Sequence, residues 1–175
     1  MNDNLNNFWN NKKVLITGHT GFKGSWLTIF LNYLGSEVHG LSREEKPGIY
    51  SMANVKKLLK SETKADISTY DTDFLSTAIS KISPDIVFHL AAQSLVIKSY
   101  EDPKDTVYSN VIGTYNVLDS INKSENTKSL IIATTDKVYK HPEKENKEEE
   151  EIGGSDFYSA TKSSAELLIN AFNNS

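Results

Sequence analysis

Residues 14–24 read VLITGHTGFKG, a short apolar run followed by glycines at positions 18, 21 and 24. The apolar run predicts a buried β-strand, and the segment after it predicts a helix that ends at Gly35. One face of that helix carries Trp26, Leu27, Phe30, Leu31 and Leu34. A strand, a glycine-rich turn and a helix N-terminus in this order favour binding of a pyrophosphate, because glycine lets the backbone approach the ligand. The residues expected to contact a dinucleotide here are Gly18, Thr20, Gly21, Phe22, Lys23 and Gly24.

Strand and helix patterns alternate through the rest of the chain. Further strands are predicted at residues 37–41, 64–67, 85–90 and 129–135. Helices are predicted at residues 74–82, 102–123 and 158–173, with a short one at 55–60 in the polar loop 42–61. The long helix begins at the cap Asp102 and should turn Val107, Val111, Leu118 and Ile121 inward. Alternation of this kind implies an α/β fold, a doubly wound parallel sheet of the Rossmann type with strand order 3-2-1-4-5.

Bulk composition describes ordinary globular material and excludes several classes of function. The 175 residues are 38% hydrophobic and 24% charged, which suits one domain, residues 1–175. The net charge of −4, without a basic stripe, argues against a nucleic acid partner. No apolar run is long enough for a membrane span, and the N-terminus does not resemble a signal peptide, so we expect a cytoplasmic protein. The chain has no cysteine and only scattered histidines, so no metal site is expected. The Glu- and Lys-rich stretch Glu143–Glu151 reads as a solvated loop.

The residues that would meet the adenosine end of a dinucleotide leave alternatives open. The usual acidic residue after the second strand is not evident, and Arg43 stands there instead. Arg43 is interpreted either as a contact for a 2′-phosphate or as a surface arginine without a ligand role, and NAD is favoured over NADP. Asp66 and Ile67 end the predicted third strand, where the carboxylate accepts from the adenine amino group or simply forms a turn. After the fourth strand, Ala91 and Ala92 are small enough for a cofactor to lie against the backbone.

Two groups of polar residues near the end of the chain predict an acid/base site. Thr134-Thr135-Asp136-Lys137 follow the apolar run 130–133, which reads as a buried strand. Tyr158 and Lys162 are spaced so that both side chains share one helical face. An ammonium beside a phenol stabilises the phenolate and lowers its pKa toward neutrality. His89, on the fourth strand, is more readily explained as a packed strand residue.

Together these segments resemble the extended short-chain dehydrogenase/reductase family, and within it the CDP-glucose 4,6-dehydratases. The resemblance covers nearly the whole chain. The matching segments are Phe8-Trp9, TGHTGFKGSWL at 17–27, HLAAQ at 89–93, SNVxGT at 109–114, TDKxY at 135–139 and GGxDxYSxxK at 153–162. Lys137 is the discriminating residue, because TDP-glucose and GDP-mannose dehydratases carry Thr-Asp-Glu there and epimerases generally lack the pair. Phe157 departs from the family pattern, which usually has proline.

The resemblance implies a mechanism in which NAD takes a hydride from C4 of the sugar and returns it to C6. Tyr158 would remove the C4 hydroxyl proton, Lys162 would lower the pKa of Tyr158, and Thr135 would hydrogen-bond the C4 oxygen. Lys137 would take the C5 proton, and a protonated Asp136 would donate to the departing C6 hydroxyl. Gln93 and Asn110 are included among the cofactor-binding residues, although Asn110 is explained equally well by a structural role.

The resemblance also implies a longer architecture. Family members are about twice this length, and their C-terminal half binds the nucleotide part of the substrate. The expected architecture is therefore the N-terminal half, with the substrate-binding part missing, an exposed sheet edge and no catalysis by these residues alone. Helices 102–123 and 158–173 resemble those that pair in family homodimers, unless the missing part buries them. The reaction would serve deoxysugar biosynthesis for the lipopolysaccharide O-antigen. Other nucleotide-sugar dehydratases or epimerases, and a non-catalytic NAD-binding module, are the alternatives.

Overall fold

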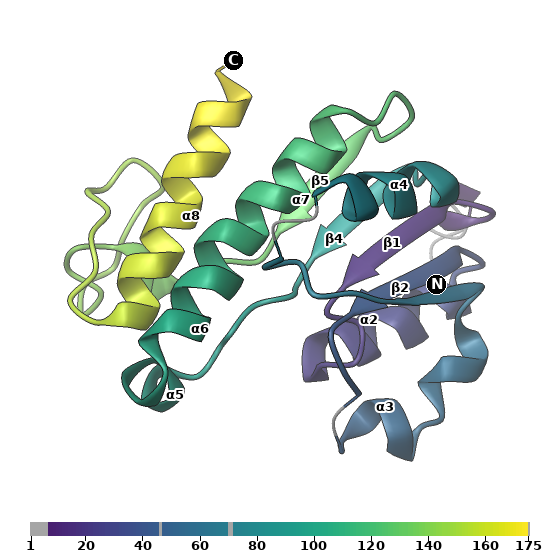
Figure 1. The fold of residues 1–175 in the computed structure, drawn as a ribbon, viewed down its shortest axis with the longest axis horizontal. Helices are drawn as coiled ribbons and strands as arrows, with labels where there is room; N and C mark the ends of the chain where they lie inside the picture. The colour runs from purple at the N-terminus through teal and green to yellow at the C-terminus, as the bar shows by residue number, and fades with distance from the viewer. Residues whose placement is uncertain (1–6, 46, 70–71, 175) are drawn as a thin grey trace.

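The computed structural model describes residues 7–45, 47–69 and 72–174, which form a parallel β-sheet covered by helices (Figure 1). The sheet has five strands in the order β3-β2-β1-β4-β5, and each neighbouring pair is parallel. The strands are β1 (Lys13–Thr17), β2 (Glu37–Ser42), β3 (Ser61–Lys64), β4 (Ile86–His89) and β5 (Ser129–Ile132). This order confirms the predicted doubly wound fold, whose direction of winding reverses between β1 and β4.

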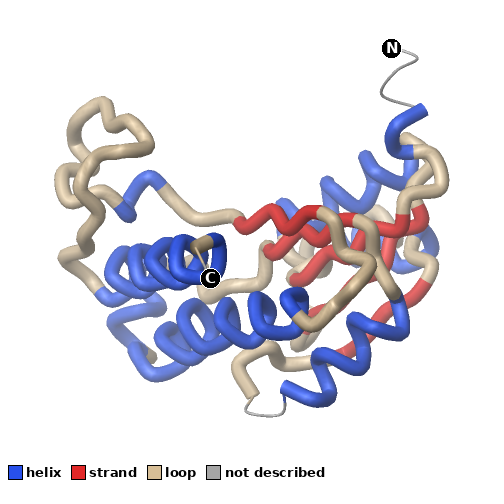
Figure 2. The backbone as a smooth tube through the Cα atoms, turned by 90° about the horizontal axis from the view of Figure 1, so that it is seen from above, coloured by secondary structure: helices blue, strands red, loops and turns tan. Residues whose placement is uncertain are grey.

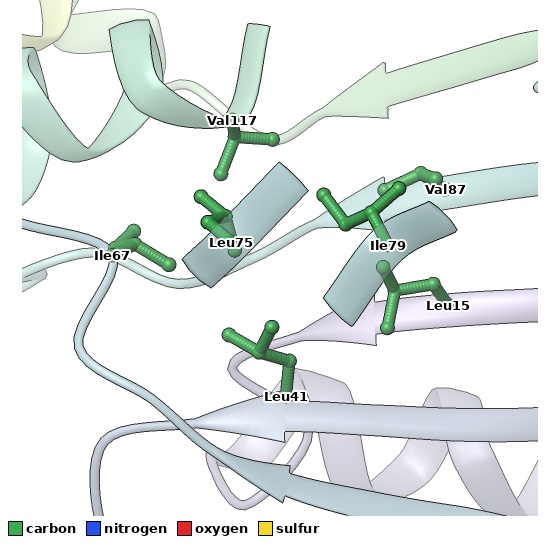
Figure 3. Packing of buried hydrophobic residues seen from close by; sticks show 7 residues of the cluster. All are labelled: Leu15, Leu41, Ile67, Leu75, Ile79, Val87 and Val117. Carbon is green, nitrogen blue, oxygen red and sulfur yellow. The ribbon is translucent and has the colours of Figure 1, made fainter. Parts of the chain in front are cut away.

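Hydrophobic residues are buried on both faces of the sheet. On one face, Leu75 and Ile79 of α4 (Thr72–Ile82) and Val117 of α7 (Gly113–Asn122) pack onto the strands (Figure 3). The strand and loop residues of this cluster are Leu15, Leu41, Ile67 and Val87. On the opposite face, Val14, Ile16, Leu31 and Val38 form a second cluster beneath α2 (Phe22–Tyr33). Successive residues of β1 therefore enter different clusters, as expected for a central strand covered on both sides.

The α2 helix buries only part of the predicted face, because Leu31 and Leu34 are buried and Leu27 packs against the second cluster, but the aromatic residues do not. Trp26 is 52% exposed and Phe30 is 50% exposed, so the aromatic residues of the predicted face lie largely in solvent. The buried residues are Gly24, Ser25, Thr28 and Leu31. Small residues are needed on this side because the start of α2 lies directly against the glycine-rich loop. A Cβ added at Gly24 would overlap the carbonyl oxygen of Gly18.

The third strand lies earlier in the chain than predicted. It spans Ser61–Lys64, so Asp66 and Ile67 follow it in a turn instead of ending it. The side chains of edge strand β3 are mostly exposed, and its sequence SETK has no apolar residue that would predict a strand. The apolar residues that suggested a strand serve another purpose, because Ile67 packs into the core and Ala65 packs against it.

The fifth strand was predicted to be buried, and this is wrong for the described residues. β5 forms the other edge of the sheet, with Ile131 43% exposed and its neighbours Leu130 and Ile132 half-buried. An apolar run usually indicates a strand whose two faces are covered. Here β5 is an edge strand that pairs only with β4, and its side chains are only partly covered. The expected open edge is therefore confirmed.

The long helical segment after Asp102 is continuous but contains a wider turn. It consists of α6 (Pro103–Val107), a π-helical turn η2 (Tyr108–Ile112) and α7. Asp102 caps it as predicted, because its side chain accepts from the backbone N–H of Asp105. The extra residue of the π turn changes the helical phase between α6 and α7. Val107, which precedes the turn, is 37% exposed, and Asn110 within the turn is buried. Of the residues predicted to point inward, Leu118 is buried, and Val111 and Ile121 are half-buried.

The remaining helical segments are short, apart from the last. They are α3 (Ile49–Met52), η1 (Val55–Leu58), α5 (Val96–Glu101), η3 (Asp136–Val138) and α8 (Phe157–Asn173). Helix α8 begins after its cap, Asp156, and lies beside α7, where the rings of Tyr115 and Phe172 are 5.9 Å apart. Between η3 and α8 the chain extends away from the sheet (Figure 2), and nearly all side chains of 143–151 are exposed, as predicted. No helix in the described residues has the length and apolar character to cross a membrane.

Candidate active site

A cavity of about 460 Å³ lies where the carboxyl ends of the five strands meet. This is the position at which doubly wound sheets bind their ligands. The residues predicted from the sequence that line it are Gly18, Thr20, Gly21, Phe22, Lys23, Gly24, Asp66, Ile67, Ala91, Ala92, Tyr158 and Lys162. The sheet thus gathers residues from four separate stretches of sequence around one space.

The three glycines of the loop differ in what surrounds them. Gly18 has a φ of +75°, and an added Cβ would lie 2.7 Å from the backbone nitrogen of Ala91, so this position needs glycine for its turn and for close packing. Gly21 precedes the first turn of α2, and the nearest atom to its added Cβ is the Gly18 oxygen at 3.3 Å. A side chain at Gly21 would crowd this oxygen, and its backbone lines the cavity beside the N-terminus of α2, whose first N–H groups have no partner within the helix. This combination fits an anionic phosphate group.

The loop after β4 is held in place by one buried amide. Asn110 is 1% exposed, and its side chain accepts from the backbone N–H of Gln93 at 2.8 Å. Its amide nitrogen donates to the Gln93 carbonyl at 3.0 Å and to the Thr161 hydroxyl of α8 at 3.1 Å. Neither Asn110 nor Gln93 lines the cavity, in contrast to Ala91 and Ala92. The geometry gives Asn110 a bracing position, which is the structural alternative that the sequence left open.

Asp66 forms the turn considered for it and also lines the cavity, so its contact with adenine stays a prediction. Its Oδ1 accepts from the backbone N–H and the hydroxyl of Ser68, at 2.9 and 2.6 Å, and so forms the turn after β3. Its Oδ2 lies 3.7 Å from Nη1 of Arg43, on the side that lines the cavity. Burial would raise the pKa of Asp66, but the hydrogen bonds from Ser68 and the charge of Arg43 hold it below its usual value.

Tyr158 and Lys162 project from α8 into the cavity, as their spacing predicted. They are 8% and 7% exposed, respectively. The Tyr158 hydroxyl has no hydrogen-bond partner among the described residues, whereas Nζ of Lys162 donates to the Ala133 carbonyl at 3.2 Å. Burial, and then the nearby charge of Lys23, lower the pKa of Lys162 to about 8, although the charge of Glu166 opposes both effects. A lysine poised near neutral pH beside a phenol is suited to proton transfer.

The lowered pKa of Lys162 predicts that stability rises with pH between about 8 and 10.5. In this interval the unfolded chain keeps the lysine proton and the folded chain has lost it, so raising the pH favours the folded state. Below pH 8 both states are protonated and burial of the charge opposes folding in full. Urea unfolding of Lys162→Met and of the parent should therefore show a stability difference that changes across this interval. Parallel curves for the two proteins would contradict the assignment.

Thr135, Asp136 and Lys137 lie outside the cavity lining. Thr135 is half-buried and starts η3, where its hydroxyl accepts from the backbone N–H of Lys137 at 3.4 Å and donates to Oδ1 of Asp136 at 3.0 Å. The side chains of Asp136 and Lys137 are exposed. Adjacent residues of a strand point to opposite faces of the sheet, but Asp136 and Lys137 belong to a 3₁₀ turn, so this constraint does not apply to them. The closed environment that the acid/base scheme requires is not provided by the described residues.

Nine further residues line the cavity, and of these the sequence had pointed only to Arg43, as one of two alternatives, and to Thr134, as part of the acid/base group. They are Ser42, Arg43, Glu44, Ala65, Leu90, Ser94, Ser109, Ala133 and Thr134. Most of them follow the end of a strand directly, so the strand order would have identified them once the strand ends were known. Thr134 donates to Oε1 of Glu166 at 2.5 Å and thus joins the end of β5 to α8.

Two histidines near the site are structural. His89 is buried, as predicted for a packed strand residue, and its ring nitrogens lie 2.7 Å from the Thr17 hydroxyl and 3.2 Å from the Thr114 hydroxyl. Burial, and then the charge of Lys162, lowers the pKa of His89 to about 3, so the ring is neutral. His19, within the glycine-rich loop, is fully buried, and its Nε2 is 2.9 Å from Oε1 of Glu62 on β3.

Comparison with known proteins agrees with this arrangement. Residues 15–175 match the family model described as GDP-mannose 4,6 dehydratase. The chain is 40% identical over 173 residues to the CDP-glucose 4,6-dehydratase of Salmonella typhimurium strain LT2, covering 97% of this chain and 47% of that protein.

Solved structures show the same fold. The UDP-N-acetylglucosamine 4-epimerase from Methanobrevibacter ruminantium M1 superposes with a TM-score of 0.80 at 25% identity, covering 95% of this chain and 52% of the epimerase. The UDP-glucose 4-epimerase from Brucella ovis in complex with NAD superposes with a TM-score of 0.78 at 24% identity, covering 95% and 48%.

The chain thus spans about half the length of the relatives it matches. The resemblance drawn from GHTGFKGSW and from the Tyr158–Lys162 pair is confirmed over nearly all of its residues. On the strength of the match over residues 15–175, the chain belongs to the GDP-mannose 4,6-dehydratase family of Rossmann-fold proteins.

Proposed function

We propose that residues 1–175 are the NAD-binding domain of a nucleotide-sugar 4,6-dehydratase that converts CDP-glucose to CDP-4-keto-6-deoxyglucose. The observation that carries the proposal is the meeting of Tyr158 and Lys162 with the glycine-rich loop around one cavity. The likeness to the Salmonella CDP-glucose 4,6-dehydratase, at 40% identity, supports the choice of substrate.

NAD fits the residues of the cavity in an extended position. The backbone at Gly21 and the start of α2 would hold the pyrophosphate, and Ala91 and Ala92 leave room for the cofactor beside β4. Asp66 would accept from the adenine amino group. When bound, NAD would supply the hydride acceptor for C4 of the sugar and the hydride donor for C6. The NAD complex of the Brucella ovis relative supports this assignment.

In the proposed reaction Tyr158 acts as the base for the C4 hydroxyl. Its free hydroxyl faces the cavity, and a protonated Lys162 beside it would stabilise the phenolate. Because the pKa of Lys162 is about 8, the charged form of the lysine is available at neutral pH. The Thr135 hydroxyl would hydrogen-bond the C4 oxygen and hold the sugar against Tyr158.

Lys137 and Asp136 would carry out the loss of water. Lys137 would take the C5 proton, which the neighbouring C4 ketone makes acidic, and Asp136 would protonate the departing C6 hydroxyl. Both side chains are exposed, so we propose that they act when a further part of the polypeptide or the bound sugar nucleotide covers them. Exclusion of water would favour the neutral forms that both steps need.

We also propose a homodimer that pairs α7 and α8, since Tyr115 and Leu167 on these helices are 43% and 60% exposed. Burial of these faces within a longer chain is the competing explanation. A cytoplasmic role in deoxysugar biosynthesis for the O-antigen agrees with the proposed product.

A panel of sugar nucleotides tests the function. The chain, alone and with any sequence that follows it in its gene, would be incubated with NAD and with CDP-, TDP-, UDP- and GDP-sugars, followed by mass spectrometry. Loss of one water from CDP-glucose alone is the expected result. Loss from a different sugar would move the substrate and keep the chemistry. Interconversion without water loss would favour an epimerase, which the structural relatives make the second candidate, and NAD binding without turnover would favour a non-catalytic module.

A further inference from the structure

Arg43 stands at the adenosine end of the cavity, directly after β2. In a doubly wound fold the residue after this strand meets the ribose of the adenosine, and an arginine there can accommodate the 2′-phosphate of NADP. Arg43 taken alone therefore favours NADP as the cofactor. The carboxylates around Arg43 favour NAD.

The guanidinium of Arg43 is held by carboxylates. Its Nη1 donates to Oδ1 of Asp105 at 2.8 Å and lies 3.7 Å from Oδ2 of Asp66. The Asp105 side chain comes from the first turn of α6 and does not line the cavity, so it draws Arg43 from behind. The hydrogen bond to Asp105, and then the charges of Asp105, Asp66 and Glu44, raise the pKa of Arg43, although its burial opposes them.

The charges at this end of the cavity disfavour an added phosphate. Glu44 and Asp66 line the cavity beside Arg43, and Asp105 lies behind it, so the charges of three carboxylates act on one guanidinium. A phosphate monoester adds between about one and a half and two negative charges at neutral pH. The unmodified ribose hydroxyl adds no charge, and it can donate a hydrogen bond to a carboxylate.

We propose that Asp105 excludes 2′-phosphorylated dinucleotides by holding Arg43 in an ion pair, and so makes the cavity selective for NAD over NADP. Asp105 is a positioning residue, because it acts through Arg43. This inference rests on the proposed binding of a nicotinamide dinucleotide. It predicts that removal of a residue outside the cavity releases a phosphate-binding arginine inside it.

The test measures dissociation constants of NAD and NADP for the purified full chain by titration calorimetry. Asp105→Asn removes the charge with little change in shape, and Asp105→Ala also removes the acceptor. Either variant should bind NADP roughly tenfold more tightly relative to NAD than the parent does, the value of one charge-assisted contact. The gain should shrink in high salt, since it depends on charge.

Two further variants separate this explanation from a general change in charge or fold. Asp119→Asn breaks the ion pair of 2.7 Å with Lys123 on α7 and serves as the matched control, which should bind like the parent. In Arg43→Ala/Asp105→Ala the gain in NADP affinity should vanish, because the released arginine is no longer there. A parent that already binds NADP as tightly as NAD, or a gain that survives in the double variant, would overturn the inference. A parent that binds neither nucleotide would instead refute the proposed function, and the inference with it.

Discussion

Tyr158→Phe is expected to slow the dehydration of CDP-glucose by about 100- to 10,000-fold, the range for loss of a general acid/base group. The phenylalanine keeps the ring that is packed in α8 and removes only the hydroxyl that faces the cavity. Because that hydroxyl has no hydrogen-bond partner among the described residues, its loss should leave the melting temperature and NAD affinity nearly unchanged. The first hydride transfer should also stop, which stopped-flow absorbance of the reduced cofactor would record.

Tyr115→Phe is the matched control for this variant. Tyr115 is a 43% exposed tyrosine of α7 that packs against Phe172, away from the cavity. The same atom is removed in both variants, so a difference between them reports the position of the hydroxyl. Reduction of the cofactor at the parental rate in Tyr158→Phe would show that another group removes the C4 proton.

Lys137→Ala should abolish water loss while NAD stays bound. If Lys137 takes the C5 proton, its removal should lower turnover by about 100- to 10,000-fold and leave hydride transfer from C4 intact. The side chain is exposed, so the free energy of unfolding should change by less than about 0.5 kcal/mol. Incubation in deuterated water followed by mass spectrometry should show deuterium at C5 of the sugar with the parent and none with the variant.

The nearby Lys140→Ala serves as the control for the second variant. Lys140 is an exposed lysine, and its Nζ lies 2.8 Å from Oε1 of Glu151, so it shares the charge and the exposure of Lys137 but has its own partner. Its loss should leave turnover unchanged. A Lys137→Ala protein that dehydrates CDP-glucose at the parental rate would remove Lys137 from the mechanism.

The local parts of the site were readable from the sequence. The glycine-rich loop is recognisable in the sequence because a strand, a turn and a helix follow one another within a few residues. The pairing of Tyr158 with Lys162 follows from helical spacing alone, and both side chains do face the cavity. The strand order was also correct, since right-handed crossovers between parallel strands leave few alternatives.

The parts that the sequence did not reveal depend on contacts between distant segments. The ion pair of Arg43 joins residues 62 positions apart, which no local pattern encodes. The inward face of α2 was predicted only in part. Leu31 and Leu34 are buried as expected, but Trp26 and Phe30 are exposed, and close packing on the glycine-rich loop requires small residues on the side that faces it. Edge strand β3 gave no apolar signal, so the prediction moved to the neighbouring residues of the core.

The bridging amide of Asn110 has a consequence for the exchange of segments between relatives. One side chain in the π turn ties the loop after β4 to α8, which carries Tyr158 and Lys162. A chimeric protein should therefore take these three segments from the same parent. A chimera with a crossover between positions 93 and 161 needs parents that both supply an amide at 110 and a hydroxyl at 161. Without these two side chains, the hydrogen bonds that align α8 with the loop after β4 would be lost in the chimera.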